Sequence, residues 1–262
     1  MVALALDLRC RVRAEPADDW SVTHLTDHQP IDGHGDYVLA TAKELVDRPL
    51  ALTVENEIPL GKGLGSSSAA RAAAAAAALR AVEGEADPQR VYEYVAAFEG
   101  HPDNAAATVF GGLVGVTPEG VPIQLPLALR WRVVVAIPDK VLPTLEARAV
   151  LDDRIDRATV VRSLARLMAL VEGLRTGDPD VLAAARGDEL HEAPRAGLNP
   201  DADRLIKSAR AAGAPHAAWS GAGPAVIAFV DSDETGVVAD ALRQTMGDGE
   251  VRIIDVAMRG LI

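Results

Sequence analysis

The sequence predicts an α+β protein of two halves, and three patterns support this prediction. Residues 2–12 alternate between apolar and charged side chains, which indicates a β-strand. Residues 69–79 read AARAAAAAAAL, and alanine is the strongest helix former. From residue 130 onward the patterns read strand, several helices, two strands, helix and strand, which is the order of a ferredoxin-like unit.

The remaining elements are predicted from local signals. In the first half we expect a helix over 35–46, a strand over 51–58 and a helix over 87–100, which begins at Asp87 with Pro88 in its first turn. In the second half we expect strands over 130–138, 216–219, 225–230 and 251–258, and helices over 144–151, 153–176, 178–192, 199–213 and 235–246. The proline-rich stretch 117–127 marks the seam, so the predicted halves are 1–125 and 126–262.

The composition limits the classes of partner and the cellular compartment that fit this sequence. A chain of 262 residues can bury a sizeable core. Its net charge of −12 argues against a nucleic-acid partner, which would require a basic surface. Cys10 is the only cysteine, so no intramolecular disulfide can form, and a reducing cytoplasm fits. No stretch is apolar enough to predict a membrane span.

The segment 59–68, PLGKGLGSSS, carries the strongest site signal. Its glycines allow close backbone approach, and the helix after it directs its positive end toward the loop. Together these features predict an anion site. A tight connection with one serine as helix N-cap is the alternative, and the loop lacks the Gly-Lys-Ser/Thr ending of the common P-loop.

Two more polar stretches accompany this loop. The stretch 99–104, EGHPDN, places a Glu, a His, an Asp and an Asn at the end of a predicted helix. The stretch 219–226, WSGAGPAV, places glycines between two predicted strands, where a backbone approaches closely.

Together these stretches resemble the small-molecule kinases of the GHMP superfamily. PLGKGLGSSSAA resembles their phosphate loop and SGAGPAVIAF their C-terminal glycine motif. EGHPDNAAATVFGG, VLPTLEARAVL and ELHEAPRAGLNP are most similar to segments of the homoserine kinases. The resemblance implies a GHMP kinase fold, with an N-terminal half like domain 2 of ribosomal protein S5 and a C-terminal ferredoxin-like half.

The resemblance also implies ATP and Mg²⁺ as cofactors. It assigns nucleotide binding to Pro59, Gly61, Lys62, Gly63, Leu64, Gly65, Ser66, Ser67, Ser68, Ser220, Gly221 and Gly223. Ser67 and Glu99 are the expected metal ligands, since Mg²⁺ prefers oxygen atoms. Glu93 is the rival of Glu99, because the loop before Pro-Asp-Asn looks shorter than in some relatives.

For the substrate, the resemblance implies a homoserine site. Asn104 is expected to orient the substrate hydroxyl, and Asp103 lies beside it; an Asx turn formed by either residue is the structural alternative. Arg148 and Arg195 are expected to bind a carboxylate or a phosphate, because a guanidinium suits bidentate recognition. Glu99, Asn104 and Arg195 are the expected catalytic residues.

One departure from the family concerns the first residues. Homoserine kinases open with a strand and a loop that help form the substrate site, whereas the first residues here, VALALDL, resemble the segment after that loop. We therefore expect an unpaired strand edge near residues 2–12, which leaves a homodimer open. The expected function is ATP-dependent phosphorylation of the homoserine hydroxyl, a step of threonine biosynthesis. The alternatives are a kinase of another small hydroxy compound and a non-catalytic nucleotide-binding relative.

Overall fold

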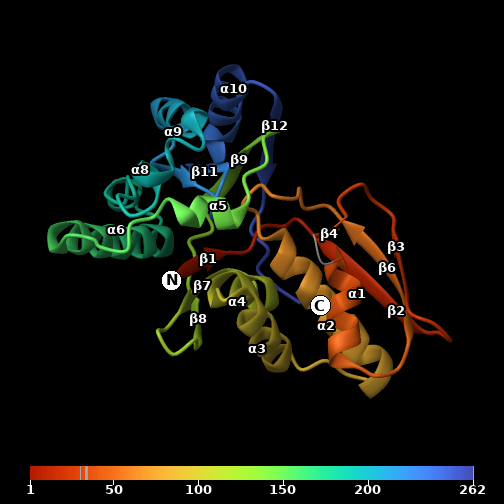
Figure 1. The fold of residues 1–262 in the computed structure, drawn as a ribbon. Helices are drawn as coiled ribbons and strands as arrows, with labels where there is room; N and C mark the ends of the chain where they lie inside the picture. Colours follow the sequence, from red (N-terminus) through yellow and green to blue (C-terminus); the bar gives the residue numbers. More distant parts are fainter. Residues whose placement is uncertain (30, 33–34, 262) are drawn as a thin grey trace. The chain divides into compact units, whose positions relative to one another are not determined.

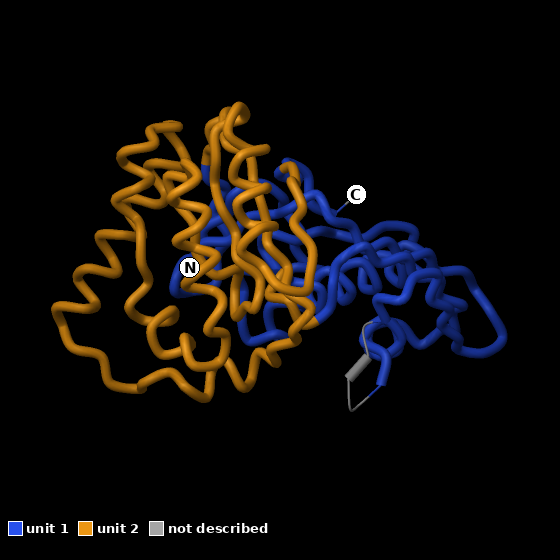
Figure 2. The backbone as a smooth tube through the Cα atoms, turned by 90° about the horizontal axis from the view of Figure 1, so that it is seen from above, with its two compact units in different colours: residues 1–60, 65–125, 256–262 blue, residues 61–64, 126–255 orange. Residues whose placement is uncertain are grey.

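The computed structural model describes residues 1–29, 31–32 and 35–261. These residues form two compact units, shown in different colours in Figure 2. Unit 1 comprises residues 1–60, 65–125 and 256–262, and unit 2 comprises residues 61–64 and 126–255. The short segment 61–64 thus belongs to unit 2, although the chain on both sides of it belongs to unit 1.

Unit 1 contains two three-stranded sheets. One sheet is antiparallel and has the order β1 (Val2–Leu4), β7 (Leu113–Val116), β8 (Pro122–Leu125). The other has the order β2 (Cys10–Pro16), β6 (Leu50–Asn56), β3 (Ser21–His24), with β2 antiparallel and β3 parallel to β6. A two-stranded pair, β4 (Ile31–Asp32) and β5 (Gly35–Asp36), precedes the first helix.

The single strand expected over residues 2–12 is wrong. It divides into β1 and β2, which belong to different sheets. The chain leaves the first sheet at Ala5, whose N–H donates to the Gly112 carbonyl, and turns at Leu8, whose N–H donates to the Leu6 carbonyl. Leu6 pairs with Val256 near the C-terminus instead. An alternation of apolar and charged residues predicts extended backbone, but it cannot show that two parts of the segment belong to different sheets.

Four helices complete unit 1, and the second is central to its core. They are α1 (Tyr37–Leu45), α2 (Ser66–Glu83), α3 (Pro88–Glu99) and α4 (Pro102–Phe110). The alanines of α2 are largely buried, because small side chains let α1, α3, α4 and β2 pack closely around this helix. As predicted, α3 has Asp87 as its N-cap, whose carboxylate accepts from the N–H groups of Gln89 and Arg90.

Unit 2 contains one four-stranded antiparallel sheet. Its order is β10 (His216–Trp219), β11 (Val226–Asp231), β9 (Trp131–Pro138), β12 (Gly249–Ile254). The first strand in the chain thus lies between the third and the fourth, which confirms the ferredoxin-like order. Helices α9 (Pro200–Ala211) and α10 (Thr235–Thr245, preceded by a 3₁₀ turn over Ser232–Glu234) cover the sheet (Figure 1).

Between β9 and α9 the chain forms four helices. They are α5 (Thr144–Ala149), α6 (Arg157–Thr176), α7 (Pro179–Ala183) and α8 (Glu192–Arg195). The helix expected over 178–192 is wrong, because α7 ends at Ala183. A carboxylate oxygen of Asp188 accepts from the N–H groups of Leu190 and His191, which competes with helical hydrogen bonds.

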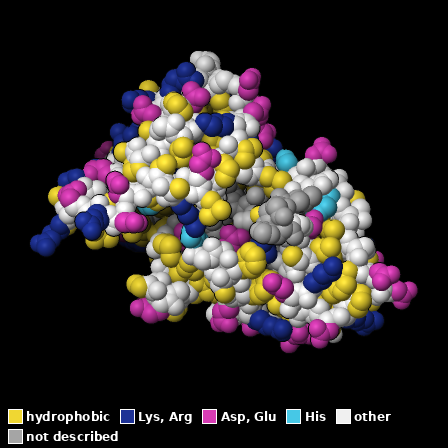
Figure 3. Space-filling model, viewed as in Figure 1, with side chains coloured by type: hydrophobic (Ala, Val, Ile, Leu, Met, Phe, Trp, Pro, Cys, Tyr) yellow, Lys and Arg dark blue, Asp and Glu magenta, His cyan; other side chains and the backbone are white. Residues whose placement is uncertain are grey.

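Two properties of the described residues concern charge and membrane crossing. On the face shown in Figure 3, basic side chains are interspersed with acidic ones, so the described part of that face has no continuous basic surface. Within the described ranges, every helix is too short or too polar to cross a lipid bilayer.

Candidate active site

The glycine-rich segment 61–64 is held in unit 2 by backbone contacts. Gly63 has a φ of +75°, and a Cβ atom there would lie 2.1 Å from the Ser220 carbonyl oxygen. The Ser220 hydroxyl donates to the Gly63 carbonyl at 2.9 Å, and the Ala225 N–H donates to the Lys62 carbonyl at 3.2 Å. Within the stretches 59–68 and 219–226 that the sequence singled out, residues 61–64 and 220–225 therefore contact each other directly.

The Lys62 side chain, which the resemblance assigns to nucleotide binding, contacts backbone carbonyls at the end of β9. Its ammonium donates to the carbonyls of Pro138, Asp139 and Lys140 at 2.5–2.9 Å. An ammonium has three N–H donors, so all of them are used on backbone. Burial lowers the pKa of Lys62. In the structure this side chain therefore holds the glycine-rich segment to the end of β9.

The first turn of α2 contains all three serines. Gly65, with a φ of +74°, occupies the N-cap position, so the interpretation of one serine as N-cap is wrong. The first N–H groups of a helix have no intrahelical acceptor, and the helix dipole places positive charge there. Ser68 is fully buried, and its hydroxyl has no hydrogen-bond partner in the part of the chain that the structure describes.

Ser67 and Glu99 form a pair at this end of α2. The Ser67 hydroxyl donates to a carboxylate oxygen of Glu99 at 3.1 Å. Glu99 is the last residue of α3, and its side chain is only 16% exposed. Glu93, the rival ligand, is exposed and accepts from Gln89 on its own helix at 2.9 Å. Glu99 is therefore the carboxylate beside the serines.

This pair has the chemistry of a magnesium site. A hydroxyl and a carboxylate oxygen are hard donors, and Mg²⁺ is usually bound by one or two carboxylates together with phosphates and water. Among the described residues, no three His, Cys, Asp or Glu side chains gather where they could hold a metal by themselves. The Ser67–Glu99 pair would supply two oxygen ligands to such an ion.

Arg71 is a site residue that the sequence reasoning missed. Its guanidinium carbon lies 3.3 Å from the ring centroid of Phe98 and 4.5 Å from that of Tyr37. Its Nε lies 3.8 Å from a Glu99 oxygen, which is too long for a hydrogen bond, and this buried N–H has no other partner among the described residues. In the sequence, Arg71 stands out only as the one charged residue within the alanine tract 69–79, one turn after Ser67.

Asp103 and Asn104 lie in the first turn of α4, so the Asx-turn alternative is wrong. Asn104 is exposed, whereas Asp103 is partly buried. Burial raises the pKa of Tyr92, and the negative charge of Asp103 is the next largest cause of this shift. Asn104 is thus the more accessible polar group of the two.

In unit 2, Arg195 connects three segments. It ends α8 and is 7% exposed. Its Nε donates to the Ala147 carbonyl in α5 at 2.8 Å, and its Nη1 donates to the Gly221 carbonyl at 3.3 Å. Burial lowers the pKa of Arg195, while the charge of Asp188 opposes this shift and the charge of Arg148 adds to it. A guanidinium suits bidentate binding of a carboxylate or a phosphate.

Comparison with known proteins agrees with this geometry. Residues 36–112 match the GHMP kinases N terminal domain, and residues 170–248 match the GHMP kinases C terminal family. A homoserine kinase of Synechocystis is 37% identical over 207 residues, which cover 78% of this chain and 67% of that protein. One of Thermus thermophilus is 33% identical over 264 residues, which cover 97% and 90%.

Some relatives align over a smaller share of their length. The chain spans 61% of the Solibacter usitatus homoserine kinase, to which it is 37% identical. Among solved structures, homoserine kinase from Cytophaga hutchinsonii has a TM-score of 0.88 at 22% identity, covering 99% of this chain and 90% of that one. At this identity the structural likeness shows the fold alone.

The two matched domains and the glycine-rich segment before α2 define a GHMP kinase, a phosphotransferase that acts on a hydroxyl group. Within that superfamily, the chain belongs to the homoserine kinase family.

Proposed function

We propose that this protein transfers the γ-phosphoryl group of ATP to the side-chain hydroxyl of L-homoserine. The homoserine kinase names of its relatives support the substrate. The single structural observation that carries the proposal is the Ser67–Glu99 pair in the first turn of α2, directly after a glycine-rich segment. We place the reaction in the cytoplasm, since the chain has a single cysteine and therefore no intramolecular disulfide.

The phosphates of ATP would be held by backbone. The N–H groups of residues 63–67 are the proposed donors, because helix N-termini and glycine loops bind anions through N–H groups. Ser220, Gly221 and Gly223 would act indirectly, by holding residues 61–64 in place. Lys62 would act in the same way through the carbonyls that it binds.

The proposed Mg²⁺ ligands are the Ser67 hydroxyl and the Glu99 carboxylate. Bound Mg²⁺ would neutralise charge on the phosphates. Arg71, which lies against Glu99 and Phe98, would hold that carboxylate in position. In this proposal Arg71 is a positioning residue rather than a catalytic one.

The substrate would be oriented by polar groups that are not strong bases. Asn104 would accept a hydrogen bond from the homoserine hydroxyl, and its amide cannot take a proton at neutral pH. The hydroxyl oxygen would attack the γ-phosphorus while its proton passes to a phosphoryl oxygen, and ADP would leave. Arg195 and Arg148 would bind the α-carboxylate of the substrate, and Asp103 would lie beside Asn104.

A coupled ADP assay with homoserine, serine, galactose and mevalonate tests the proposal. We expect turnover with homoserine and at least about tenfold lower kcat/KM with each of the others. Turnover of another compound alone would identify a different substrate. Calorimetric binding of Mg-ATP without any turnover would mean that the protein is a non-catalytic relative.

A further inference from the structure

Arg71 is a buried cation enclosed by the two helices that pack beside α2. Helix α1 supplies the ring of Tyr37 and, one turn later, the hydroxyl of Thr41. Helix α3 supplies the hydroxyl of Tyr94 and, one turn later, the ring of Phe98. Residues four apart are neighbours on one face of a helix, so each helix presents one ring and one hydroxyl together. The guanidinium is therefore in contact with two elements besides its own.

A chain of hydrogen bonds leads from Arg71 to the surface of unit 1. The Arg71 Nη1 donates to the Thr41 hydroxyl oxygen at 3.3 Å. Thr41 is hydrogen-bonded to Tyr94, whose hydroxyl donates to the exposed carboxylate of Glu44. Burial, followed by the hydrogen bond to Glu44, raises the pKa of Tyr94 to about 12, so this hydroxyl stays protonated at neutral pH. Because its proton is used on Glu44, its oxygen accepts the Thr41 proton, and the chain has one direction.

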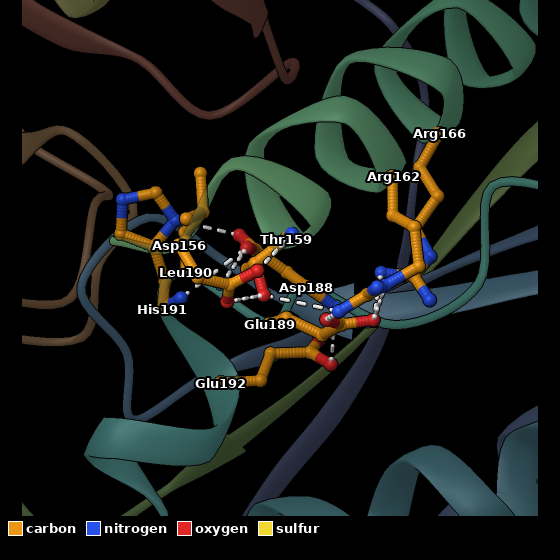
Figure 4. Close-up of polar contacts among 9 residues, drawn as sticks. All are labelled: Asp156, Thr159, Arg162, Arg166, Asp188, Glu189, Leu190, His191 and Glu192. Atoms are coloured by element: carbon orange, nitrogen blue, oxygen red, sulfur yellow. Dashed lines mark hydrogen bonds and ion pairs between the residues drawn. The ribbon is translucent and has the colours of Figure 1, made fainter.

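The contact between Arg71 and Glu99 differs from the arginine–glutamate contacts of α6. Figure 4 shows Arg162 and Arg166 of α6 at the carboxylate of Glu189. The Arg162 Nε donates to its two oxygens at 3.0 and 3.1 Å, and the Arg166 Nη1 donates to one of them at 2.7 Å. These contacts lower the pKa of Glu189 to about 2. A carboxylate paired in this way has little acceptor capacity left for a metal ion.

The carboxylate of Glu99 is left more open. The Arg71 Nε remains 3.8 Å from a Glu99 oxygen, and within the described ranges only the Ser67 hydroxyl donates to this carboxylate. An unpartnered buried N–H costs free energy, which favours closing this gap. The gap stays open because the guanidinium is bound elsewhere, by the hydrogen bond to Thr41 and by the two aromatic rings. Arg71 is therefore restrained near Glu99 without being paired to it.

We propose that Thr41 and Tyr94 are positioning residues of the metal site. They hold Arg71 away from Glu99 and so leave that carboxylate free for Mg²⁺. If the hydrogen-bond chain were broken, the guanidinium would close on Glu99 in the manner of the α6 contacts, and the ion would have to compete with it. This inference rests on the proposed function, in which Glu99 is a magnesium ligand.

Two substitutions of Thr41 test the restraint. Thr41→Val keeps the shape of the side chain and removes the hydroxyl, whereas Thr41→Ser keeps the hydroxyl and removes a methyl group. Residues that orient metal ligands change metal affinity roughly 10- to 100-fold, and Thr41 lies one contact further away. Calorimetry should therefore show about fivefold weaker Mg-ADP binding in Thr41→Val and unchanged binding in Thr41→Ser. ADP binding in the presence of EDTA should be the same in both variants and the wild type.

An Arg71→Lys background tests whether Thr41 acts through Arg71. Thr41→Val should have no further effect on Mg-ADP binding there, because the effects of residues that act through one contact are not additive. Tyr94→Phe should weaken Mg-ADP binding in the wild type in the same direction. Thr159→Val is the matched control, since its hydroxyl accepts from Arg162 at 3.0 Å in unit 2 (Figure 4), and it should change nothing. Additive effects, or unchanged Mg-ADP binding in Thr41→Val, would overturn the inference.

Glu99→Gln separates this inference from the metal site on which it rests. If Glu99→Gln bound Mg-ADP as tightly as the wild type, Glu99 would not be a metal ligand and both proposals would be wrong. If Glu99→Gln weakened Mg-ADP binding and Thr41→Val did not, only the restraint of Arg71 would be wrong. A wild type that bound Mg-ADP but did not phosphorylate homoserine would contradict the proposed substrate and not the restraint, because the measured quantity is Mg-ADP binding.

Discussion

Two regions of the candidate site are built by different means. In unit 2, the segment 61–64 lies so close to the backbone of residues 220–223 that its critical position, Gly63, has no room for a side chain. In unit 1, the start of α2 is organised by the side chains of Ser67, Arg71 and Glu99. A side-chain atom added in the first region should therefore destabilise the fold. In the second region, a substitution that keeps the size of the side chain should leave the protein folded but lower its activity.

The largest effect should come from Gly63→Ala. The added Cβ atom would overlap the Ser220 carbonyl oxygen, and backbone cannot move aside as a side chain can. We expect a loss of at least about 4 kcal/mol in the free energy of unfolding, or failure to fold. Urea denaturation measures the loss.

Gly65→Ala is the matched control for that change. Gly65 has nearly the same φ, +74°, but no atom lies within 4 Å of an added Cβ. Gly65→Ala should lower the free energy of unfolding only by the cost of the left-handed backbone conformation, about 1–2 kcal/mol. Equal losses at the two positions would show that backbone conformation, and not the close approach, explains both glycines.

Glu99→Gln should affect activity next most strongly. The amide keeps the size of the side chain and its hydrogen bond with Ser67 but removes the negative charge that Mg²⁺ requires. We expect kcat to fall about 100-fold or more while the protein remains folded. The coupled ADP assay at saturating substrates measures this fall.

Glu93→Gln provides the comparison for Glu99→Gln, since Glu93 is exposed on the same helix. Its kcat should stay close to that of the wild type. If Glu93→Gln abolished turnover and Glu99→Gln did not, the assignment of the metal ligand would be reversed.

A smaller effect is expected from Arg71→Lys. Lysine keeps the charge near Glu99 but loses the planar group that stacks on Phe98 and Tyr37. We expect the Mg²⁺ concentration for half-maximal rate to rise about tenfold, as for other residues that orient metal ligands. Arg90→Lys, an exposed change on α3, is the control. A loss of stability without a change in Mg²⁺ dependence would mean that Arg71 is only structural.

Arg195→Lys should have the most selective effect. Lysine cannot donate to Ala147 and Gly221 together and still bind a carboxylate bidentately. We expect the KM for homoserine to rise about tenfold, equivalent to about 1.4 kcal/mol. ATP affinity, measured by calorimetry, should stay close to wild type. Weaker ATP binding with an unchanged homoserine KM would assign Arg195 to the glycine loop instead.

The sequence by itself determined the features that depend on neighbours in the chain. The Asp87–Pro88 start of α3, the helix over the alanine tract and the succession of strands and helices along unit 2 all rest on short-range preferences. The resemblance of residues 59–68 to a phosphate loop could also be recognised, because the glycines and serines of this segment are close together in the sequence.

Only the tertiary structure decided which distant groups meet. It divided residues 2–12 between two sheets, placed Glu99 rather than Glu93 beside Ser67, and committed the Lys62 ammonium to three carbonyls of residues 138–140. It also turned the polar side of α6 toward Glu189. Each of these outcomes depends on a contact between residues that are far apart in the sequence. Hydrophobic periodicity predicts that one face of a helix or strand is apolar, but it does not predict what packs against that face.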